Sequence, residues 1–194
     1  MGMMLRRRML QMLQKVGSSD YFLENVIISS GVRQNLPIKL LDSNSAFTVL
    51  VEYQELQEYE GSYYNMDIVS CGQSQGNFST AIRICRYAQY AMCRLNNGGK
   101  DENLNTYPEL KNSRMKFVLR FNPATTPTST FYINDLTPNT RTQTITLNDG
   151  YVNIGGQNGG AGGDSTGKIW GLYIYKKALT DTQISDYITN SIIP

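Results

Sequence analysis

Residues 167–184 read GKIWGLYIYKKALTDTQI, and this stretch carries the local signals of a β-strand followed directly by a helix. β-Branched and aromatic residues dominate positions 168–176, which favours a strand. Thr180 then stands at the N-cap position of a helix, and Gln183 three residues later completes a capping box. The sequence therefore predicts that a strand ends near residue 176 and that a short C-terminal helix begins after Thr180.

The side of this helix that packs on the domain is also readable from the sequence. Leu179 and Ile184 occupy the two positions of a hydrophobic staple, which fixes the angle at which the chain enters the helix. Ile184, Tyr187 and Ile188 follow at helical spacing on one side. We expect these apolar residues to face the rest of the fold.

Upstream of this stretch the hydrophobic pattern has the two-residue period of strands. Residues 46–54, AFTVLVEYQ, place Phe47, Val49, Val51 and Tyr53 on one face and polar residues with Leu50 on the other. Turn residues separate similar short runs at close intervals, which is typical of an all-β sandwich or barrel. The clearest other strands are predicted at 79–86, 90–95, 115–121, 130–134, 142–147, 151–156 and 168–176.

The order of these elements resembles the laminin-G-like branch of the concanavalin A-like lectin/glucanase superfamily, over roughly residues 20–190. The residues that carry the resemblance are Phe-Thr-Val at 47–49, IVSCG at 68–72, FYIND at 131–135, VNIGG at 152–156 and, above all, 167–184. The resemblance implies a jelly-roll β-sandwich of two antiparallel sheets. Members of the superfamily include glycan-binding modules, adhesion domains and glycosidases, so the fold alone does not select a function.

The first sixteen residues differ from the rest of the chain. Apolar residues recur at helical spacing beside a basic run, which predicts an amphipathic helix over 1–16 and a linker over 17–20 before the sandwich at 21–194. The segment has a charge of +4 and the whole chain has a net charge of +2, so the remaining residues together carry about −2. Three uses stay open for it: docking on its own domain, on a partner chain or on a membrane surface. The candidate docking residues are Leu5, Arg6, Arg7, Arg8, Met9, Met12, Leu13 and Val16.

Composition excludes several classes of function. The 194 residues contain no histidine, which closes every mechanism that needs an imidazole, and 59 of them are Asn, Gln, Ser or Thr. A surface of neutral hydrogen-bonding groups does not suit nucleic acid.

No stretch is apolar for the roughly 20 residues of a membrane span, and the N-terminus does not fit a secretion signal. Cys71, Cys85 and Cys93 are expected to be buried thiols, and the alternative left open is that Cys85 and Cys93 face each other across a hairpin.

Carboxylate chemistry remains, and the spacing of the glutamates argues against it. Retaining glucanases hold two carboxyl groups roughly 5–5.5 Å apart, which needs alternate residues of one strand. Glu52 and Glu55 are three apart and are predicted to point to opposite faces, which leaves Glu58 and Glu60 as the only neighbours. We expect no enzyme activity, with a glycoside hydrolase as the weakest alternative.

The glycine-rich stretch 155–167 resembles a phosphate-binding loop but lacks the helix and the Ser or Thr that such a loop needs. We expect no cofactor. Calcium held by loop oxygens, with Asp149 and Asp164 as candidates, is the alternative to a turn role for these residues.

Tyrosines near amides are the candidates for glycan contact, since aromatic faces flanked by polar groups suit sugars. The candidates are Tyr63, Tyr64, Tyr87, Gln89, Tyr90 and Trp170, and Trp170 is predicted to face outward. Tyrosine suits core and interface positions equally well, so both roles stay open.

The MLRRRML start ahead of such a domain further resembles small structural proteins of tailed phages of gut bacteria. This resemblance implies a virion component docked to other virion proteins through its N-terminal helix, with surface or mucosal glycans as further partners and self-association left open. The alternative is a free-standing bacterial carbohydrate-binding module outside the cell or on its surface.

Overall fold

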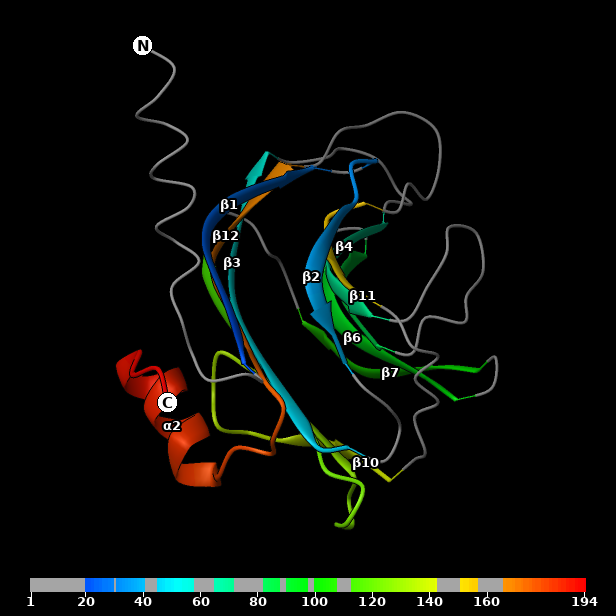
Figure 1. Ribbon diagram of the computed structural model, residues 1–194, viewed down its shortest axis with the longest axis vertical. Coiled ribbons are helices and arrows are strands. Elements are labelled where there is room, and N and C mark those ends of the chain that lie inside the picture. The colour runs from blue at the N-terminus through cyan, green and yellow to red at the C-terminus, as the bar shows by residue number, and fades with distance from the viewer. Residues whose placement is uncertain are drawn as a thin grey trace.

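The computed structural model describes residues 20–29, 31–40, 45–57, 65–71, 82–87, 90–97, 100–107, 113–142, 151–156 and 166–194. Within these ranges the chain folds into two facing antiparallel sheets and a C-terminal helix (Figure 1). The predicted jelly-roll class, an all-β sandwich of two antiparallel sheets, is confirmed. The predicted N-terminal helix, with all its candidate docking residues, lies outside the described residues.

In the part of the chain that the structure describes, each sheet has six strands. Sheet A has the order β1 (Tyr21–Ser29), β12 (Thr166–Tyr175), β3 (Phe47–Gln57), β8 (Arg114–Phe121), β9 (Ser129–Ile133) and β10 (Asn139–Arg141). Sheet B has the order β2 (Gln34–Lys39), β11 (Tyr151–Ile154), β4 (Asn65–Cys71), β5 (Ile82–Tyr87), β6 (Tyr90–Asn97) and β7 (Lys100–Tyr107). Neighbours such as β12 and β3 are more than 100 residues apart in the chain, so the sheets are built from non-local pairings.

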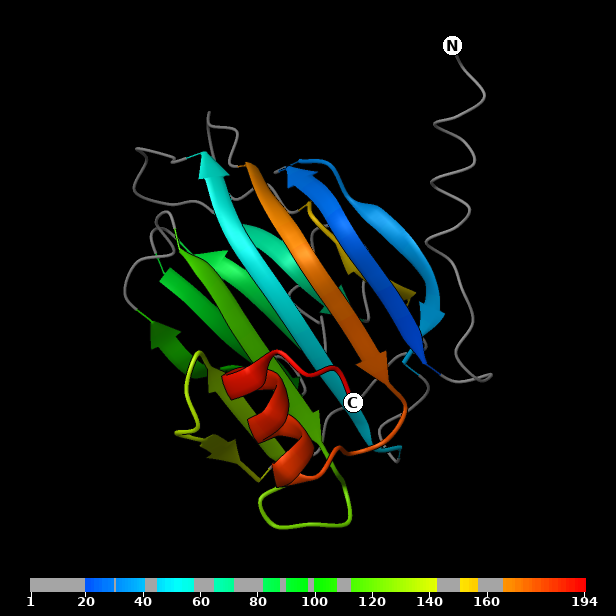
Figure 2. The ribbon, with the colours of Figure 1, turned by 90° about the vertical axis from the view of Figure 1, so that its left-hand side faces the viewer.

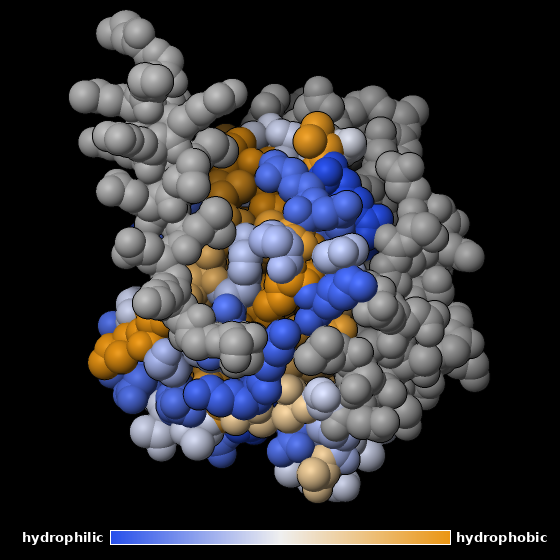
Figure 3. All heavy atoms as spheres, in the orientation of Figure 1, coloured by the Kyte–Doolittle hydropathy of each residue, from blue (hydrophilic) through white to orange (hydrophobic). Residues whose placement is uncertain are grey.

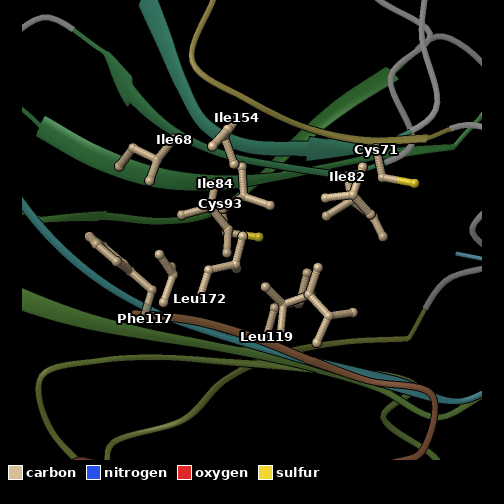
Figure 4. Close-up of a cluster of buried hydrophobic side chains, with 14 of the residues drawn as sticks. Ile68, Cys71, Ile82, Ile84, Cys93, Phe117, Leu119, Ile154 and Leu172 are labelled. Carbon is tan, nitrogen blue, oxygen red and sulfur yellow. The ribbon is translucent and has the colours of Figure 1, made fainter. Parts of the chain in front are cut away.

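The main core lies between the two sheets and follows the two-residue period of the strands. On β3 the predicted inward set, Phe47, Val49, Val51 and Tyr53, is buried in this core. Figure 4 shows side chains from the two sheets pointing toward one another, with Ile68, Ile84 and Cys93 opposite Phe117 and Leu172. Burial of this apolar surface is the main stabilising contribution to the sandwich.

Gly167, the first residue of the C-terminal motif, makes room for a core side chain. A Cβ atom at Gly167 would lie 2.1 Å from the hydroxyl oxygen of Tyr53 and 2.3 Å from its ring. The Tyr53 side chain is fully buried and donates a hydrogen bond of 2.7 Å to Glu55 Oε2. Any larger residue at 167 would therefore displace the Tyr53 ring.

A second core forms between sheet A and the helix α2 (Asp181–Asn190). The Thr180 hydroxyl oxygen accepts a hydrogen bond from the Gln183 backbone N–H, and Gln183 Oε1 accepts one from the Thr180 backbone N–H, so the predicted capping box is confirmed. The helix buries Ile184, Tyr187 and Ile188, as predicted, against outer-face residues that include Leu50 of β3. Figure 2 shows α2 lying across one end of sheet A.

Lys116 of β8 holds the C-terminal end of α2. Its Nζ donates to the carbonyl oxygens of Tyr187 and Ile188 at 2.9 and 2.8 Å and to Ser191 Oγ at 2.8 Å. A cation there complements the negative end of the helix dipole and satisfies carbonyls that the helix leaves open. The opposite end is held by Arg120, which pairs with Asp181.

Most predicted strands are found, with shifted ends. The hairpin of β5 and β6 closes at the pair Tyr87 and Tyr90, and β8 and β9 match their predicted ranges to within one or two residues. The predicted strand 142–147 is not tested, because 143–147 lie outside the described residues. The short β10 just before it was not predicted, and neither were β1, β2, β4 and β7.

All three cysteines are buried, as expected, and none of them forms a disulfide. Cys93 faces the main core and pairs with Ile84 across the hairpin, whereas Cys85 pairs with Met92 and does not belong to that cluster, so the two cysteines are not directly opposed. Burial raises the pKa of Cys71 to about 11, so its thiol stays protonated at neutral pH. In the described ranges, no helix is both long enough and apolar enough to cross a membrane.

Candidate functional site

A buried ion pair lies on the face of sheet B that is turned away from the core. Arg83 of β5 places both Nε and one terminal guanidinium nitrogen 2.7 Å from Asp67 Oδ1 of β4. Arg83 is 3% exposed and Asp67 is 8% exposed. Charged side chains this deeply buried are rare in proteins unless they are paired.

A β-bulge at Ile68 creates this arrangement. Asp67 pairs with Cys85 while Val69 already pairs with Ile84, so Ile68 is the extra residue. Ile68 and Val69 can then both face the core, and Asp67 and Ser70 come to share the opposite face. The Ser70 side chain hydrogen-bonds the Asp67 carboxyl group. The bulge thus re-aims a short polar segment without exposing the apolar residues beside it.

Burial dominates the electrostatics of Asp67. Loss of hydration raises the pKa of the Asp67 carboxyl group, while the positive charges of Arg83 and Arg33 and the hydrogen bonds from Arg83 and Ser70 act in the opposite direction. The guanidinium groups of Arg83 and Arg33 therefore both act on the Asp67 carboxyl group.

Arg33 approaches this pair beside Gly156. A Cβ atom at Gly156 would lie 2.9 Å from Arg33 Cβ, and the glycine has φ +93°, a conformation that other residues rarely adopt. The Gly156 carbonyl accepts a 3.4 Å hydrogen bond from the Asp67 backbone N–H. The Nε of Arg33 is buried and has no hydrogen-bond partner in the structure.

Asn153 of β11 extends the polar surface across the sheet. It pairs with Ser70 of β4 on one side and with Asn35 of β2 on the other. Asn153 is 2% exposed, and its Nδ2 donates to the Tyr151 carbonyl at 2.8 Å. Its Oδ1 is buried without a partner. We call Arg33, Asp67, Ser70, Arg83 and Asn153 the polar cluster.

Tyr151 gives the same face an aromatic surface. Residues Val152 and Ile154 point into the core, so the alternation of β11 places Tyr151 beside Asn153 on the outer face. Tyr151 is 50% exposed, and Lys39 Nζ of β2 lies 4.8 Å from its ring centroid. Figure 3 views the molecule from the edge where β2 lies and shows hydrophilic residues around that strand.

Trp170 lies on the other sheet. It is the extra residue of a bulge in β12, between the pairs Ile169–Tyr53 and Gly171–Glu52, and it faces outward from sheet A. Its Nε1 donates to Gln54 Oε1 at 3.0 Å. Arg114 Cζ and Lys168 Nζ lie 3.5 and 3.2 Å from the ring centroid.

Two cationic groups this close to one ring cannot share a face without overlapping, so they cover opposite faces of the indole. A sugar can stack on Trp170 only after one of them moves.

Of the other residues predicted to contact a glycan, the structure describes only Tyr87 and Tyr90. Tyr87 and Tyr90 end the two strands of the β5–β6 hairpin in sheet B, which separates them from Trp170 in sheet A. Tyr63, Tyr64 and Gln89 lie outside the described residues. The glycan role of these residues stays a prediction.

The glutamates of β3 are arranged as predicted, on opposite faces. Glu55 is buried on the core side, where it accepts the Tyr53 hydrogen bond, and Glu52 lies on the outer face 3.6 Å from Arg114. Glu58 and Glu60 lie outside the described residues, as do Asp149 and Asp164. Within the described part of the chain, no three His, Cys, Asp or Glu residues gather in a way that could hold a metal ion.

Sequence reasoning missed the polar cluster and Tyr151. A signal was present, because Asp67 in NMDIVSC and Arg83 in IRIC are charged residues flanked on both sides by core residues. The pairing of these strands and the bulge at Ile68 were needed to bring the two charges together.

Comparison with known proteins identifies the fold. No family model matches the chain, and no curated protein does. The binding domain of botulinum neurotoxin serotype G matches with a TM-score of 0.60 and 11% identity, covering 92% of this chain and 44% of that one. A neurotoxin type C structure, described as entering cells through two ganglioside molecules, matches with a TM-score of 0.57 and 12% identity over 86% of this chain and 46% of that one.

The sialidase of Trypanosoma rangeli matches with a TM-score of 0.55 and 15% identity, covering 77% of this chain and 23% of that one. The chain therefore spans less than half of these proteins. The matches show that it shares a fold with these proteins, a β-sandwich of the kind that the sequence resemblance implied, and they show no link to phages.

Proposed function

We propose that this protein is a non-catalytic carbohydrate-binding module whose glycan contacts Tyr151 and the polar cluster on the outer face of sheet B. The observation that carries the proposal is the pairing of a half-exposed aromatic ring with buried polar atoms that lack partners, Arg33 Nε and Asn153 Oδ1. A sugar offers an apolar face for the ring and hydroxyl groups that can both donate and accept hydrogen bonds.

The fold supports the same function. Solved proteins with this fold include a neurotoxin whose cell entry depends on interaction with gangliosides, and a sialidase. Because the match covers less than half of either protein, the ganglioside contacts of the neurotoxin can belong to its unmatched part. The proposed site therefore rests on the geometry of this chain.

We propose that the protein has no catalytic activity, and the arrangement of the described glutamates supports this because they do not form a pair. Glu52 and Glu55 are separated by the thickness of sheet A, so they cannot flank one glycosidic bond. Incubation with soluble glucans tests this point directly. Cleavage that Glu58→Gln abolishes would contradict the non-catalytic assignment.

A glycan array probed with the full chain tests the binding function. The best ligand is then titrated against Tyr151→Ala and Tyr151→Phe. Tyr151→Phe keeps the ring and should bind like the unmodified protein, whereas Tyr151→Ala should lose at least about tenfold in affinity, equivalent to about 1.4 kcal/mol. Equal binding by both variants, or no binding to any glycan, would refute the proposed site.

A virion role remains a second proposal, supported by the basic amphipathic pattern of residues 1–16 rather than by the structural matches. In this case the protein would be a virion component, and in the first case we propose a location outside a bacterial cell or on its surface. Removal of residues 1–16 should abolish incorporation into particles while leaving the sandwich folded. Normal incorporation of the shortened chain would rule out docking through this segment.

A further inference from the structure

We infer that residues 1–16 dock on their own domain, where they run back along β1 and cover the open edge of the sandwich between β1 and β2. The inference goes beyond the glycan proposal, because it concerns a different surface. It rests on the apolar side chains at this edge, the interruptions in its two strands, the point at which the chain enters β1, and the spacing and charge of residues 1–16.

The edge is formed by the outermost strand of each sheet. β1 stands at the end of sheet A and β2 at the end of sheet B, and each pairs with one neighbouring strand in the part of the chain that the structure describes. The two strands, blue in Figures 1 and 2, lie on the same side of the molecule. The core between the sheets therefore reaches the surface along this side.

Apolar side chains are accessible along the edge. Tyr21, Leu23 and Val26 of β1 pack against the main core but are only partly buried. Ile27 is 49% exposed, and Val32, in the connection from β1 to β2, is 54% exposed. Figure 3 looks onto this edge and shows hydrophobic residues between β1 and β2. Burial of such a strip under another part of a protein is favourable.

The backbone of the two edge strands disfavours an added β-strand as the cover. Asn25 of β1 has φ 57° and is skipped by the register between β1 and β12, so the edge of β1 is interrupted near its middle. Pro37 of β2 has no N–H group to donate. A strand from a second copy needs a regular row of donors and acceptors. A helix packs through its side chains and needs no backbone partner.

Residues 1–19 join the described part of the chain beside this edge. Asp20 is held at the start of β1, where its Oδ1 accepts a hydrogen bond of 3.2 Å from the Lys176 backbone N–H. Residues 17–19 span at most about 11 Å, so Val16 lies close to the start of β1. The nearby outer face of sheet A is already covered by α2. The edge between β1 and β2 stays uncovered and within reach.

The apolar stripe of the predicted N-terminal helix has the length of this edge. Leu5 and Val16 are the ends of the stripe and lie about 16 Å apart along the helix axis, at about 1.5 Å per residue. From Tyr21 to Val26, β1 also extends about 16 Å, at about 3.3 Å per residue. A helix that runs antiparallel to β1 can therefore place the whole stripe on the apolar side chains of the edge.

Charge favours a position along β1. Residues 1–16 carry +4, whereas residues 20–29 contain Asp20 and Glu24 and no basic residue. Glu24 is exposed, so a basic side chain can approach it. β2 ends in Lys39, which would repel a basic segment. The segment should therefore lie closer to β1 than to β2.

Two matched variants of the full chain test the docking by hydrogen exchange. Met12→Glu introduces a charge into the apolar stripe, and Gln11→Glu introduces the same charge on the polar side of the predicted helix. Met12→Glu should speed the exchange of peptides from β1 about tenfold, because the edge loses its cover, while Gln11→Glu should leave it within about twofold. Peptides from β8, in the interior of sheet A, should not respond to either change.

Photocrosslinking identifies what covers the edge. A benzophenone amino acid in place of Met12 should attach to peptides of β1 or β2 of the same chain. In place of Gln11 it should give much less of this product. The yield should not depend on protein concentration, because the contact is within one chain.

The possible results decide for or against the inference. Equal exchange of β1 in the Met12→Glu and Gln11→Glu variants would overturn it, and so would crosslinks that avoid β1 and β2. Crosslinks between two chains, with a yield that rises with concentration, would assign the edge to a second copy instead. Thermal melts establish that the variants keep the fold. Glycan binding by Tyr151→Ala is measured separately, so the two proposals can fail independently.

Discussion

Replacing Arg83 by methionine should strongly destabilise the sandwich. The substitution keeps most of the side-chain volume but leaves the carboxylate of Asp67, which is only 8% exposed, without the group that places two nitrogens 2.7 Å from its Oδ1. Removal of one member of a buried ion pair typically costs about 3–5 kcal/mol. For a domain of this size that corresponds to a fall in melting temperature of roughly 6–20 °C.

The stability that Arg83→Met loses should depend on pH, and the loss should be larger at neutral than at acidic pH. Burial already raises the pKa of Asp67 in the folded protein, and loss of Arg83 removes the main influence that lowers it. An acid with a raised pKa in the folded state binds its proton more tightly when folded. In the variant, the stability that protonation of Asp67 contributes is therefore fully present below about pH 4, the ordinary pKa of aspartate, and it is lost as pH rises through the pKa of Asp67 in the folded state. The deficit relative to the unmodified protein should be smaller at pH 4 than at pH 7.

Urea denaturation at both pH values measures these quantities. The double variant Asp67→Asn with Arg83→Met removes both charges and should recover much of the stability, because a neutral pair leaves no buried charge. Arg114→Met is the control, since it removes a 3.6 Å pair with Glu52, in which the arginine is 47% exposed, and the contact of Arg114 with the Trp170 ring, and it should cost less than about 2 kcal/mol. If Arg83→Met costs no more than this control, or if the double variant shows no recovery, the reasoning about the buried pair is wrong.

Three further predictions concern other parts of the fold. The Tyr187 hydroxyl is buried with no hydrogen-bond partner in the structure, so Tyr187→Phe should raise the free energy of unfolding by about 1 kcal/mol. Tyr175→Phe removes a 2.9 Å hydrogen bond to the Pro194 carbonyl and should lower the free energy of unfolding by a similar amount. The opposite order of the two variants in urea denaturation would contradict this prediction. Thr180→Ala removes the helix cap and should cost about 1 kcal/mol, and Thr180→Ser should cost less, as thermal melts would show. Trp170 is the single tryptophan, so a glycan that binds on sheet B should leave its fluorescence unchanged, and a shift on binding would favour the site first predicted at Trp170.

Local signals in the sequence were sufficient for some elements. The capping box at Thr180 and the alternation from Phe47 to Tyr53 depend on residues a few positions apart, and both appear in the structure as predicted. The outward direction of Trp170 could also be predicted. The coverage of its ring could not, because Arg114 comes from β8, two strands away in sheet A.

The candidate site depended on information that no local pattern holds. Asp67 and Arg83 become neighbours only through the register of β4 on β5, and Asn153 joins them because β11 pairs with β4 from more than 80 positions along the chain. The bulge at Ile68 shifts which residues share a face, so simple alternation would place Ser70 in the core. Register and bulges are set by the packing of the whole sandwich.

The positions of Asp20 and Pro194 determine how this domain can be displayed. The Lys176 backbone N–H donates to Asp20 Oδ1 at 3.2 Å, and the Tyr175 hydroxyl donates to the Pro194 carbonyl at 2.9 Å, so both residues are anchored at the same end of β12 in sheet A. The polar cluster is on the far side of the molecule, on the outer face of sheet B. A tether joined at either position would leave that face pointing away from the support. The domain can therefore be fused or immobilised through either position, on a bead, a sensor chip or a larger assembly, with its candidate sugar site presented to solution.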